Sequence, residues 1–226
     1  MSVFEKAIGW LAPAQCVSCS REGSAICNEC AGHITRFGER CWRCNTLSPG
    51  SRTCDTCRRT GSPLYIYIAT DYQGQARSLL STYKFGHLRA AANPIAKIMV
   101  EALTEYQDIL LDYLVVPVPT ATKRIRERGF GHSELLARQV AINLKFEYAN
   151  ILRRLGQSRQ LGSRREVRLT QLTNSFASKN DRSISGQNIL LVDDVLTTGG
   201  TVLSAAKVLK ASGAKRVDAL LFAKRL

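Results

Sequence analysis

The sequence has no long apolar run, no cysteine after position 57 and few acidic side chains. None of its apolar segments approaches the ~18 residues that a membrane-spanning helix needs. Residues 1–14 carry Phe4, Ile8 and Leu11 at helical spacing, which favours a short amphipathic helix over a signal peptide. We therefore expect a cytoplasmic protein with no membrane span. Lys and Arg outnumber Asp and Glu by 32 to 18, which indicates phosphate-rich partners, either a pyrophosphorylated sugar or a nucleic acid backbone.

The absence of late cysteines predicts a domain boundary. All eight cysteines lie between Cys16 and Cys57, so we expect a small cysteine-rich domain over 1–60 and a larger domain over 61–226, joined near 61–63. A chain of 226 residues has room for one sizeable core and such an appendage.

The cysteines form four C-x-x-C pairs. Two intervening residues let both sulfurs of a pair face one ion, and four thiolates at the corners of a tetrahedron satisfy zinc. The pairs therefore predict two zinc sites, grouped either in sequence order, which the gaps favour, or in a crossed arrangement. Disulfides are the main alternative, but they rarely persist in a reducing cytoplasm, and a redox role for one pair is a second. The predicted ligands are Cys16, Cys19, Cys27, Cys30, Cys41, Cys44, Cys54 and Cys57.

The cysteine-rich segment has little apolar surface of its own, so bound metal would have to supply much of its folding free energy. Four thiolates leave no open coordination position, and we therefore expect structural or partner-binding sites rather than catalytic ones. In this segment Trp42, Arg43, Arg58 and Arg59 look exposed, where they could contact a nucleic acid or a protein or simply cover the metal sites.

The larger segment alternates strands and helices. Apolar, β-branched runs predict strands, and apolar residues at helical spacing predict helices. The strands cover 64–69, 113–116, 150–152, 188–192 and 216–222, and the helices cover 74–83, 93–106, 131–145 and 199–211. Residues 156–168 are polar and basic and favour a loop. The last strand, helix and strand form a parallel crossover unit, so we expect an α/β fold with a doubly wound parallel sheet whose ligands bind at the carboxyl ends of the strands.

An apolar strand runs directly into the acid pair Asp193-Asp194, and a Thr-Thr-Gly-Gly-Thr segment (197–201) then leads into a helix. Glycines and hydroxyls at a helix N-terminus form a cup that faces a phosphate, and paired carboxylates accept hydrogen bonds from sugar hydroxyls with the help of magnesium. The pattern therefore predicts a sugar phosphate site. The alternative is that the acids only end a strand and that Thr198 or Thr201 caps a helix. The chain lacks the Gly-Lys-Ser/Thr of a Walker site and the Gly-x-Gly of a dinucleotide site.

Four stretches carry a resemblance to known families. LLVDDVLTTGGT (190–201) resembles the phosphoribosyl pyrophosphate motif of type I phosphoribosyltransferases. Together with the cysteine pairs, YQGQARSLLSTYKF (72–85), VPVPTATKRIRERGF (116–130) and the terminal LLFAKR, it resembles the ComF family, also called GntX-like, over nearly the whole sequence. The resemblance implies a type I phosphoribosyltransferase-like domain after a double zinc ribbon. It also implies a role in processing incoming single-stranded DNA in competent bacteria, with helicase and recombination proteins as partners.

The resemblance implies roles for individual residues. Asp193 and Asp194 would contact the ribose hydroxyls with magnesium, and together with Arg128 they are the candidate catalytic residues. The 5′-phosphate would be held by Thr197, Thr198, Gly199, Gly200 and Thr201, and the pyrophosphate would lie near Val118, Pro119 and Thr120. The candidates for nucleic acid contacts are Arg124, Arg126 and Arg128.

Two functions stay open at this point. One is transfer of phosphoribose to an unidentified nucleophile, and the other is a binding module for single-stranded DNA and proteins that retains the phosphate cup. Gly131-His132 replaces the Asn-Gln that the family carries after Arg-Gly-Phe, so the sequence names no acceptor. His132 and His87 are each expected to be surface or capping residues rather than acid–base groups.

Overall fold

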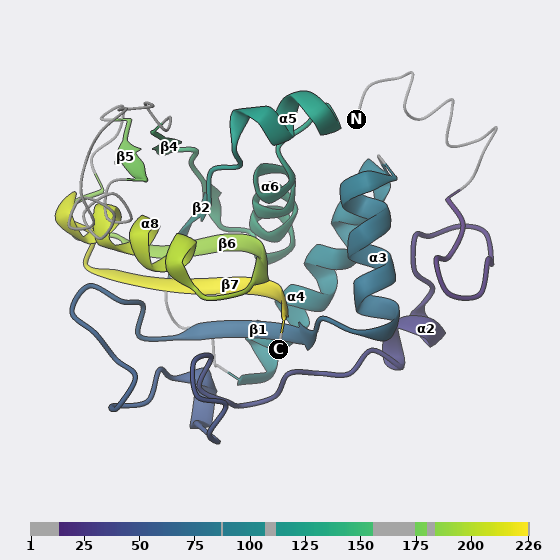
Figure 1. Cartoon of the computed structure of the whole chain (residues 1–226), viewed down its shortest axis with the longest axis horizontal. Coiled ribbons are helices and arrows are strands. Elements are labelled where there is room, and N and C mark those ends of the chain that lie inside the picture. Colours follow the sequence, from purple (N-terminus) through teal and green to yellow (C-terminus); the bar gives the residue numbers. More distant parts are fainter. Residues whose placement is uncertain (1–13, 87, 107–111, 156–174, 180–183, 226) are drawn as a thin grey trace, which may run out of the picture.

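The core of the protein is a five-stranded parallel sheet with helices on both faces (Figure 1). The computed structural model describes residues 14–86, 88–106, 112–155, 175–179 and 184–225. The predicted N-terminal helix, apart from its last residue, and the predicted loop over 156–168 lie outside these residues, as does His87. Among the helices that are described, none is long and apolar enough to cross a membrane.

The strand order of the sheet is β1-β7-β6-β2-β3, and every neighbouring pair is parallel. The strands are β1 (Ile66–Asp71), β2 (Tyr113–Pro117), β3 (Glu147–Tyr148), β6 (Asn188–Leu196) and β7 (Arg216–Lys224). A separate antiparallel pair consists of β4 (Leu152–Arg154) and β5 (Phe176–Ser178).

Helices cover the two faces of the sheet. On one face lie α4 (Ala92–Tyr106) and α6 (His132–Leu144), and on the other lies α8 (Gly200–Ala211). Side chains of β1 alternate between the two cores, since Tyr67 packs with the first group and Ile68 with the second. Burial on both faces explains why the strands read as continuous apolar runs. The expected doubly wound parallel sheet is confirmed.

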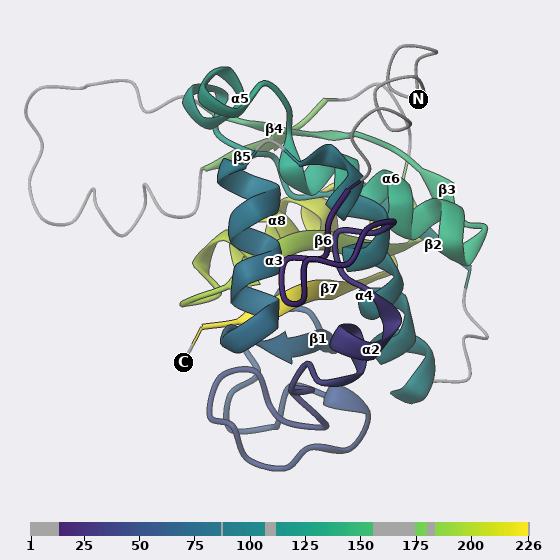
Figure 2. The same ribbon diagram turned by 90° about the vertical axis from the view of Figure 1, so that its right-hand side faces the viewer.

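Helix α3 (Gly74–Phe85) stands across the carboxyl ends of the strands in both views (Figures 1 and 2). The 3₁₀ turn η2 (Arg89–Ala91) links it to α4. The short helix α5 (Thr122–Arg128) follows β2 and was not expected from the sequence. Its residues TKRIRER are charged on nearly all sides, so no apolar stripe marks it as a helix.

Strand β6 is longer than the sequence pattern predicts. Its apolar run ends at Val192, but the strand continues to Leu196 because Asp193 and Leu196 still pair with Leu221 and Lys224 of β7. The acid pair therefore lies within a strand. The strand therefore does not end at the acid pair, as both interpretations of the sequence place it, but two residues later.

The cysteine-rich segment covers the outer edge of β1 and shares the cores of the sheet. It includes α2 (Asn28–Gly32) and the 3₁₀ turn η1 (Pro49–Ser51). It forms one isolated bridge from Arg36 to β1 and another from Arg52 to Tyr65, the residue before β1. Ile26 and Ile34 pack in the core below α4, whereas Phe37 and Trp42 pack in the core below α8. An edge strand covered in this way is protected from pairing with other chains.

One expectation for this segment is wrong. Trp42 is buried, with an exposed fraction of 4%, because its ring packs into the core below α8. Arg43, Arg58 and Arg59 are exposed, as expected.

Candidate functional site

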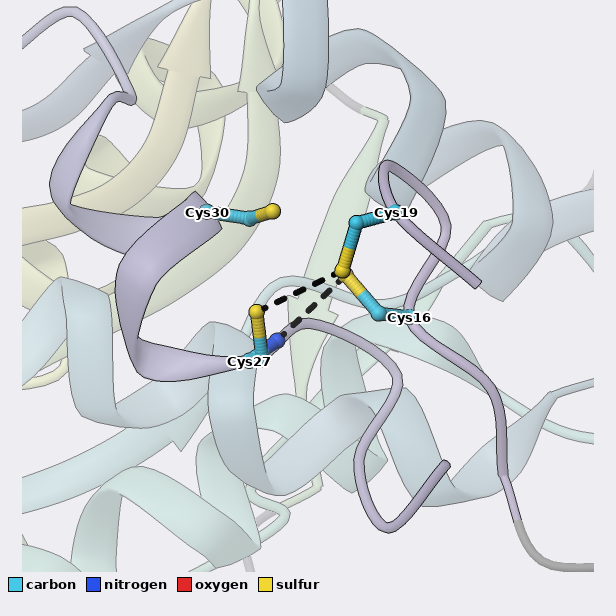
Figure 3. A group of neighbouring side chains, drawn as sticks. All are labelled: Cys16, Cys19, Cys27 and Cys30. Carbon is cyan, nitrogen blue, oxygen red and sulfur yellow. Dashed lines mark hydrogen bonds between the residues drawn. The ribbon is translucent and has the colours of Figure 1, made fainter. Parts of the chain in front are cut away.

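The eight cysteines form two clusters in sequence order. The first contains Cys16, Cys19, Cys27 and Cys30, and the second contains Cys41, Cys44, Cys54 and Cys57. Within each cluster the four sulfur atoms all lie within 4.8 Å of one another, and Figure 3 shows the side chains of the first cluster converging. None of the eight cysteines forms a disulfide. The sequential grouping favoured by the gaps is confirmed.

The spacing of the sulfur atoms fits zinc. A tetrahedral site with Zn–S bonds of about 2.3 Å places its sulfurs about 3.8 Å apart. The Sγ atoms of Cys19 and Cys27 lie 3.7 Å apart, and those of Cys44 and Cys54 lie 3.6 Å apart. Four thiolates at these distances fill the coordination sphere, so the two clusters fit closed, structural zinc sites.

The electrostatics of the second cluster also favour a bound cation. The hydroxyl of Thr46, 3.2 Å from the sulfur of Cys44, lowers the pKa of that thiol to about 6. Burial, followed by hydrogen bonds with neighbouring thiols, raises the pKa of Cys57 to about 12. Thiolates packed this closely repel one another, and a divalent cation is what allows all four to lose their protons.

The second candidate site lies at the carboxyl edge of the sheet, between β2 and β6. The connection after β2 leads to α6 on one face, and that after β6 leads to α8 on the other, so the two connections diverge where the two strands end. The backbone N–H of Val118 donates a hydrogen bond to the carbonyl of Val192 (2.9 Å). The structure thus brings the predicted pyrophosphate segment, Val118 to Thr120, beside Asp193.

Among the residues that the structure describes, the acid pair has three polar partners. Ser133 Oγ donates to Asp193 Oδ1 (2.7 Å), as does the backbone N–H of Asp194 (2.9 Å). Lys84 Nζ lies 2.7 Å from Asp194 Oδ2, and both of those side chains are 16% exposed. Burial and the neighbouring charge of Asp194 raise the pKa of Asp193 to about 7. The carboxylate oxygens of the pair form a donor set that fits magnesium, and they can accept hydrogen bonds from sugar hydroxyls.

The predicted phosphate cup follows β6 directly. Thr197, Thr198 and Thr201 are exposed, and Gly199 has a positive φ of 77° at the start of α8. Gly199 is the N-cap residue, and no side chain caps this helix. The alternative that Thr198 or Thr201 acts as the cap is therefore wrong, which leaves their hydroxyls available beside the positive end of the helix dipole.

Sequence reasoning missed two residues at the acid pair. Lys84 belongs to the YKF stretch of α3, but only the fold shows that its ammonium reaches Asp194. Ser133 lies in the first turn of α6 and carries no motif signal. His132, expected at the surface or as a cap, is 1% exposed, because its ring packs against Tyr83 and Phe130 with ring centroids 4.9 Å and 4.4 Å apart.

The predicted nucleic acid residues lie on α5, beyond the C-terminal end of α3 in both views (Figures 1 and 2). The side chains of Arg124 and Arg126 are exposed. Two positions along an α-helix correspond to a rotation of about 200°, so these two arginines do not share one side of α5. Arg128 ends the helix, and its side chain is not among those that the structure describes.

Comparison with known proteins gives a family match and several sequence relatives. Residues 125–226 match the phosphoribosyl transferase domain family. Competence protein ComFC of Streptococcus pneumoniae is 28% identical over 87% of this chain and 86% of its own length. DNA utilization protein YhgH of Salmonella typhimurium is 26% identical over 85% of this chain and 87% of its own length.

Among solved structures, an adenine phosphoribosyltransferase covers 65% of this chain and 75% of its own, at 17% identity and a TM-score of 0.38. The resemblance to the ComF family is confirmed by the sequence relatives: the chain is a homologue of the ComFC and YhgH proteins, and it joins two four-cysteine clusters that fit a double zinc ribbon to a phosphoribosyl transferase domain.

Proposed function

We propose that this protein binds phosphoribosyl pyrophosphate, with magnesium, at the carboxyl edge of the sheet. One observation carries the proposal: an acid pair, Asp193 and Asp194, lies on the strand that leads into an uncapped helix N-terminus lined with exposed threonines, and among the described residues Lys84 is the cation in direct contact with the pair. The first group suits a cation and ribose hydroxyls, and the second suits a phosphate. A phosphorylated sugar carries both the hydroxyls and the phosphate that these two groups of residues would bind.

Different residues of the site would bind different parts of phosphoribosyl pyrophosphate. Thr197, Thr198 and Thr201, with the backbone of Gly199 and Gly200, would hold the 5′-phosphate. Asp193 and Asp194 would hold the ribose hydroxyls and the magnesium, which neutralises charge when bound. Val118, Pro119 and Thr120 would contact the pyrophosphate. The side chain of Lys84 would move from Asp194 or remain as a second cation.

The same arrangement suits transfer of the phosphoribosyl group. In that reaction the bond between ribose C1 and the pyrophosphate oxygen breaks, pyrophosphate leaves with its electron pair, and a nucleophile bonds to C1. Positioning and charge neutralisation carry such a step, because its transition state develops positive charge on the sugar. Arg128, the last residue of the helix that follows the pyrophosphate segment in sequence, is proposed as the residue that neutralises the leaving group.

Calorimetric titration with phosphoribosyl pyrophosphate in the presence of magnesium tests the proposal. Asp194→Asn keeps the size of the side chain but removes its charge, so affinity should fall by about 1.5 to 3 kcal/mol, the usual contribution of a hydrogen bond to a charged group. Its dependence on magnesium should weaken. Thr201→Val should lower affinity without changing the magnesium dependence, because its hydroxyl donates to the phosphate.

Thr104→Val supplies a control, since Thr104 is an exposed threonine on α4, away from the cup. Absence of binding by the wild type, or equal binding by all variants, would remove the proposal. Pyrophosphate release during a scan of nucleobases would then separate an enzyme from a binding module.

We further propose that the protein acts on internalised single-stranded DNA, which its relatives' names as competence and DNA utilization proteins favour. Helicase and recombination proteins are the proposed partners, and a cytoplasmic location would keep the thiol clusters reduced. Phosphate contacts by Arg124 and Arg126 should make binding steeply dependent on salt and nearly indifferent to sequence. Reversing both arginines to glutamate should weaken binding severalfold.

Lys215→Glu supplies the control for that experiment, because Lys215 is exposed and precedes β7 at the amino edge of the sheet. Arg216 is unsuitable, since it pairs with the buried Asp218. Affinity that ignores salt would exclude direct DNA binding through this surface.

A further inference from the structure

The second cysteine cluster contacts the predicted phosphate cup through a tryptophan. A Cβ atom added to Gly199 would lie 2.8 Å from Cη2 of Trp42 and closer still to Cζ3. No side chain fits in that space, so the indole rests directly on the backbone of the cup. The positive φ of Gly199, 77°, independently favours glycine at this position.

Trp42 is anchored by the residues that hold the metal. It follows Cys41, and its indole N–H donates a hydrogen bond to Oγ1 of Thr53 (3.1 Å), which precedes Cys54. Thr53 is fully buried and in turn donates to the carbonyl of Pro63 (3.2 Å). Since Cys41 and Cys54 belong to one cluster, a metal ion bound there fixes both ends of the Trp42–Thr53 hydrogen bond.

The same cluster reaches the carboxyl edge at a second place. Asn45, next to Cys44, accepts a hydrogen bond from the ammonium of Lys224 at the end of β7. Lys224 is 6% exposed and lines a cavity of about 290 Å³, together with Asp71 and Arg77 among others. The cavity also includes Arg225, whose backbone N–H donates to the carbonyl of Leu196, immediately before the cup.

The first cluster has no corresponding contact among the described residues. Its residue at the position of Trp42 is Val17, which packs against the core below α4. The two clusters share the same pattern of ligands, but within the part of the chain that the structure describes, the contact with Gly199 comes from Trp42 of the second cluster.

We infer that Trp42 is a positioning residue for the phosphate loop and that the second cysteine cluster, with its metal, is part of the ligand site. This inference rests on the proposed binding of phosphoribosyl pyrophosphate at that loop. A rigid indole behind Gly199 holds the backbone N–H groups of the cup in place, so less ordering is needed when the phosphate binds. By linkage, ligand binding in turn stabilises the second metal site.

Truncating the ring tests the effect on affinity. Trp42→Ala should weaken binding of phosphoribosyl pyrophosphate about tenfold or more, and Trp42→Phe, which keeps an aromatic ring but loses the indole N–H, should weaken it about twofold to fivefold. Leu47→Ala is the matched control, because Leu47 lies in the same segment and is 78% exposed. Each variant should retain two zinc ions per chain. Unchanged affinity in a zinc-loaded Trp42→Ala protein would overturn the inference.

Fluorescence provides a readout that does not depend on truncating Trp42. The chain has two tryptophans, Trp10 and Trp42, so Trp10→Phe leaves Trp42 as the sole reporter. Emission of this protein should change as the ligand saturates, whereas constant emission at saturation would contradict contact between the ring and an occupied cup. This measurement also decides the matter if Trp42→Ala does not fold.

A ligand-free experiment separates the inference from the proposed function. Adding Gly199→Ala to the Trp10→Phe protein should displace the indole and shift its emission to longer wavelength; Gly186→Ala, at a glycine with similar positive φ (74°) and no neighbour near its Cβ, should not. If the wild type binds no ligand but this shift appears, the proposed function fails while the contact stands. If Gly199→Ala leaves the emission unchanged, the inference itself fails.

Discussion

Carboxylates lie at both ends of the same sheet, fully buried at one end and partly buried at the other, and their surroundings differ. At the amino edge, Asp218 has no exposed surface and accepts hydrogen bonds from the hydroxyl of Tyr113 (2.7 Å), the backbone N–H of Tyr65 (3.1 Å) and Nε of Arg216 (2.5 Å). At the carboxyl edge, Asp193 and Asp194 adjoin each other, and among the described residues the ammonium of Lys84 is in direct contact with Asp194.

The difference distinguishes a structural carboxylate from one kept for a ligand. Burial raises the pKa of Asp218, but a hydroxyl and a guanidinium oppose that effect, and its negative charge has a cation in direct contact. Asp193 has no cation in direct contact among the described residues, and its pKa lies near 7. A carboxylate that has few partners in the fold can still coordinate a cation or accept hydrogen bonds from the hydroxyls of a sugar.

The largest expected change in stability comes from replacing Asp218 at the amino edge. Asp218→Ala leaves the guanidinium of Arg216 and the hydroxyl of Tyr113 without their buried acceptor. The free energy of unfolding should therefore fall by about 3 kcal/mol or more, as for other broken buried pairs. Chemical denaturation measures it, with Asp112→Ala, an exposed acid at the same edge, as the control. A loss below about 1 kcal/mol would mean that Asp218 is not the structural carboxylate of the pair.

At the carboxyl edge, replacing an acid should raise the free energy of unfolding rather than lower it. Between about pH 4 and pH 7 the unfolded chain has lost the Asp193 proton while the folded chain keeps it, so stability falls as pH rises through this window. Asp193→Asn removes that cost and should stabilise the chain by about 1 kcal/mol at pH 8, with a smaller gain at pH 5.

Melting curves at the two pH values check the stability of Asp193→Asn, and titration with phosphoribosyl pyrophosphate checks its binding, which should be strongly weakened. If Asp193→Asn destabilised the chain at pH 8 as much as Asp218→Ala does, Asp193 would be a structural carboxylate like Asp218.

The smallest effect concerns Lys84, whose charge lowers the pKa of Asp193. Lys84→Met should raise that pKa. Because stability falls with rising pH only up to the pKa of Asp193 in the folded chain, the upper end of this fall should move to higher pH by about 0.5 to 1 pH unit. A series of melting temperatures from pH 5 to pH 9 measures this, with Lys97→Met, an exposed lysine on α4, as the control. A uniform loss of stability with no movement along the pH axis would assign Lys84 a packing role instead.

Much of the fold could be predicted because its signals are local. Buried parallel strands read as apolar runs, and the predicted centres of β1, β2, β6 and β7 agree with the structure. The prediction failed where a local signal was missing. Helix α5 has charges around most of its surface, so it shows no apolar stripe. The end of β6 is polar, and it is extended because it pairs with β7 rather than because of its own composition.

The sequence alone determined the two cysteine clusters and the acid pair followed by the threonine-glycine cup, because C-x-x-C spacing and a strand–turn–helix segment each place their groups within a few residues. Only the tertiary structure decided that Lys84 faces Asp194, that Asp218 is fully partnered and that Trp42 rests on Gly199. Trp42 looked exposed because its own segment has no core to bury it. It is buried because the sheet, formed by residues far along the chain, provides one.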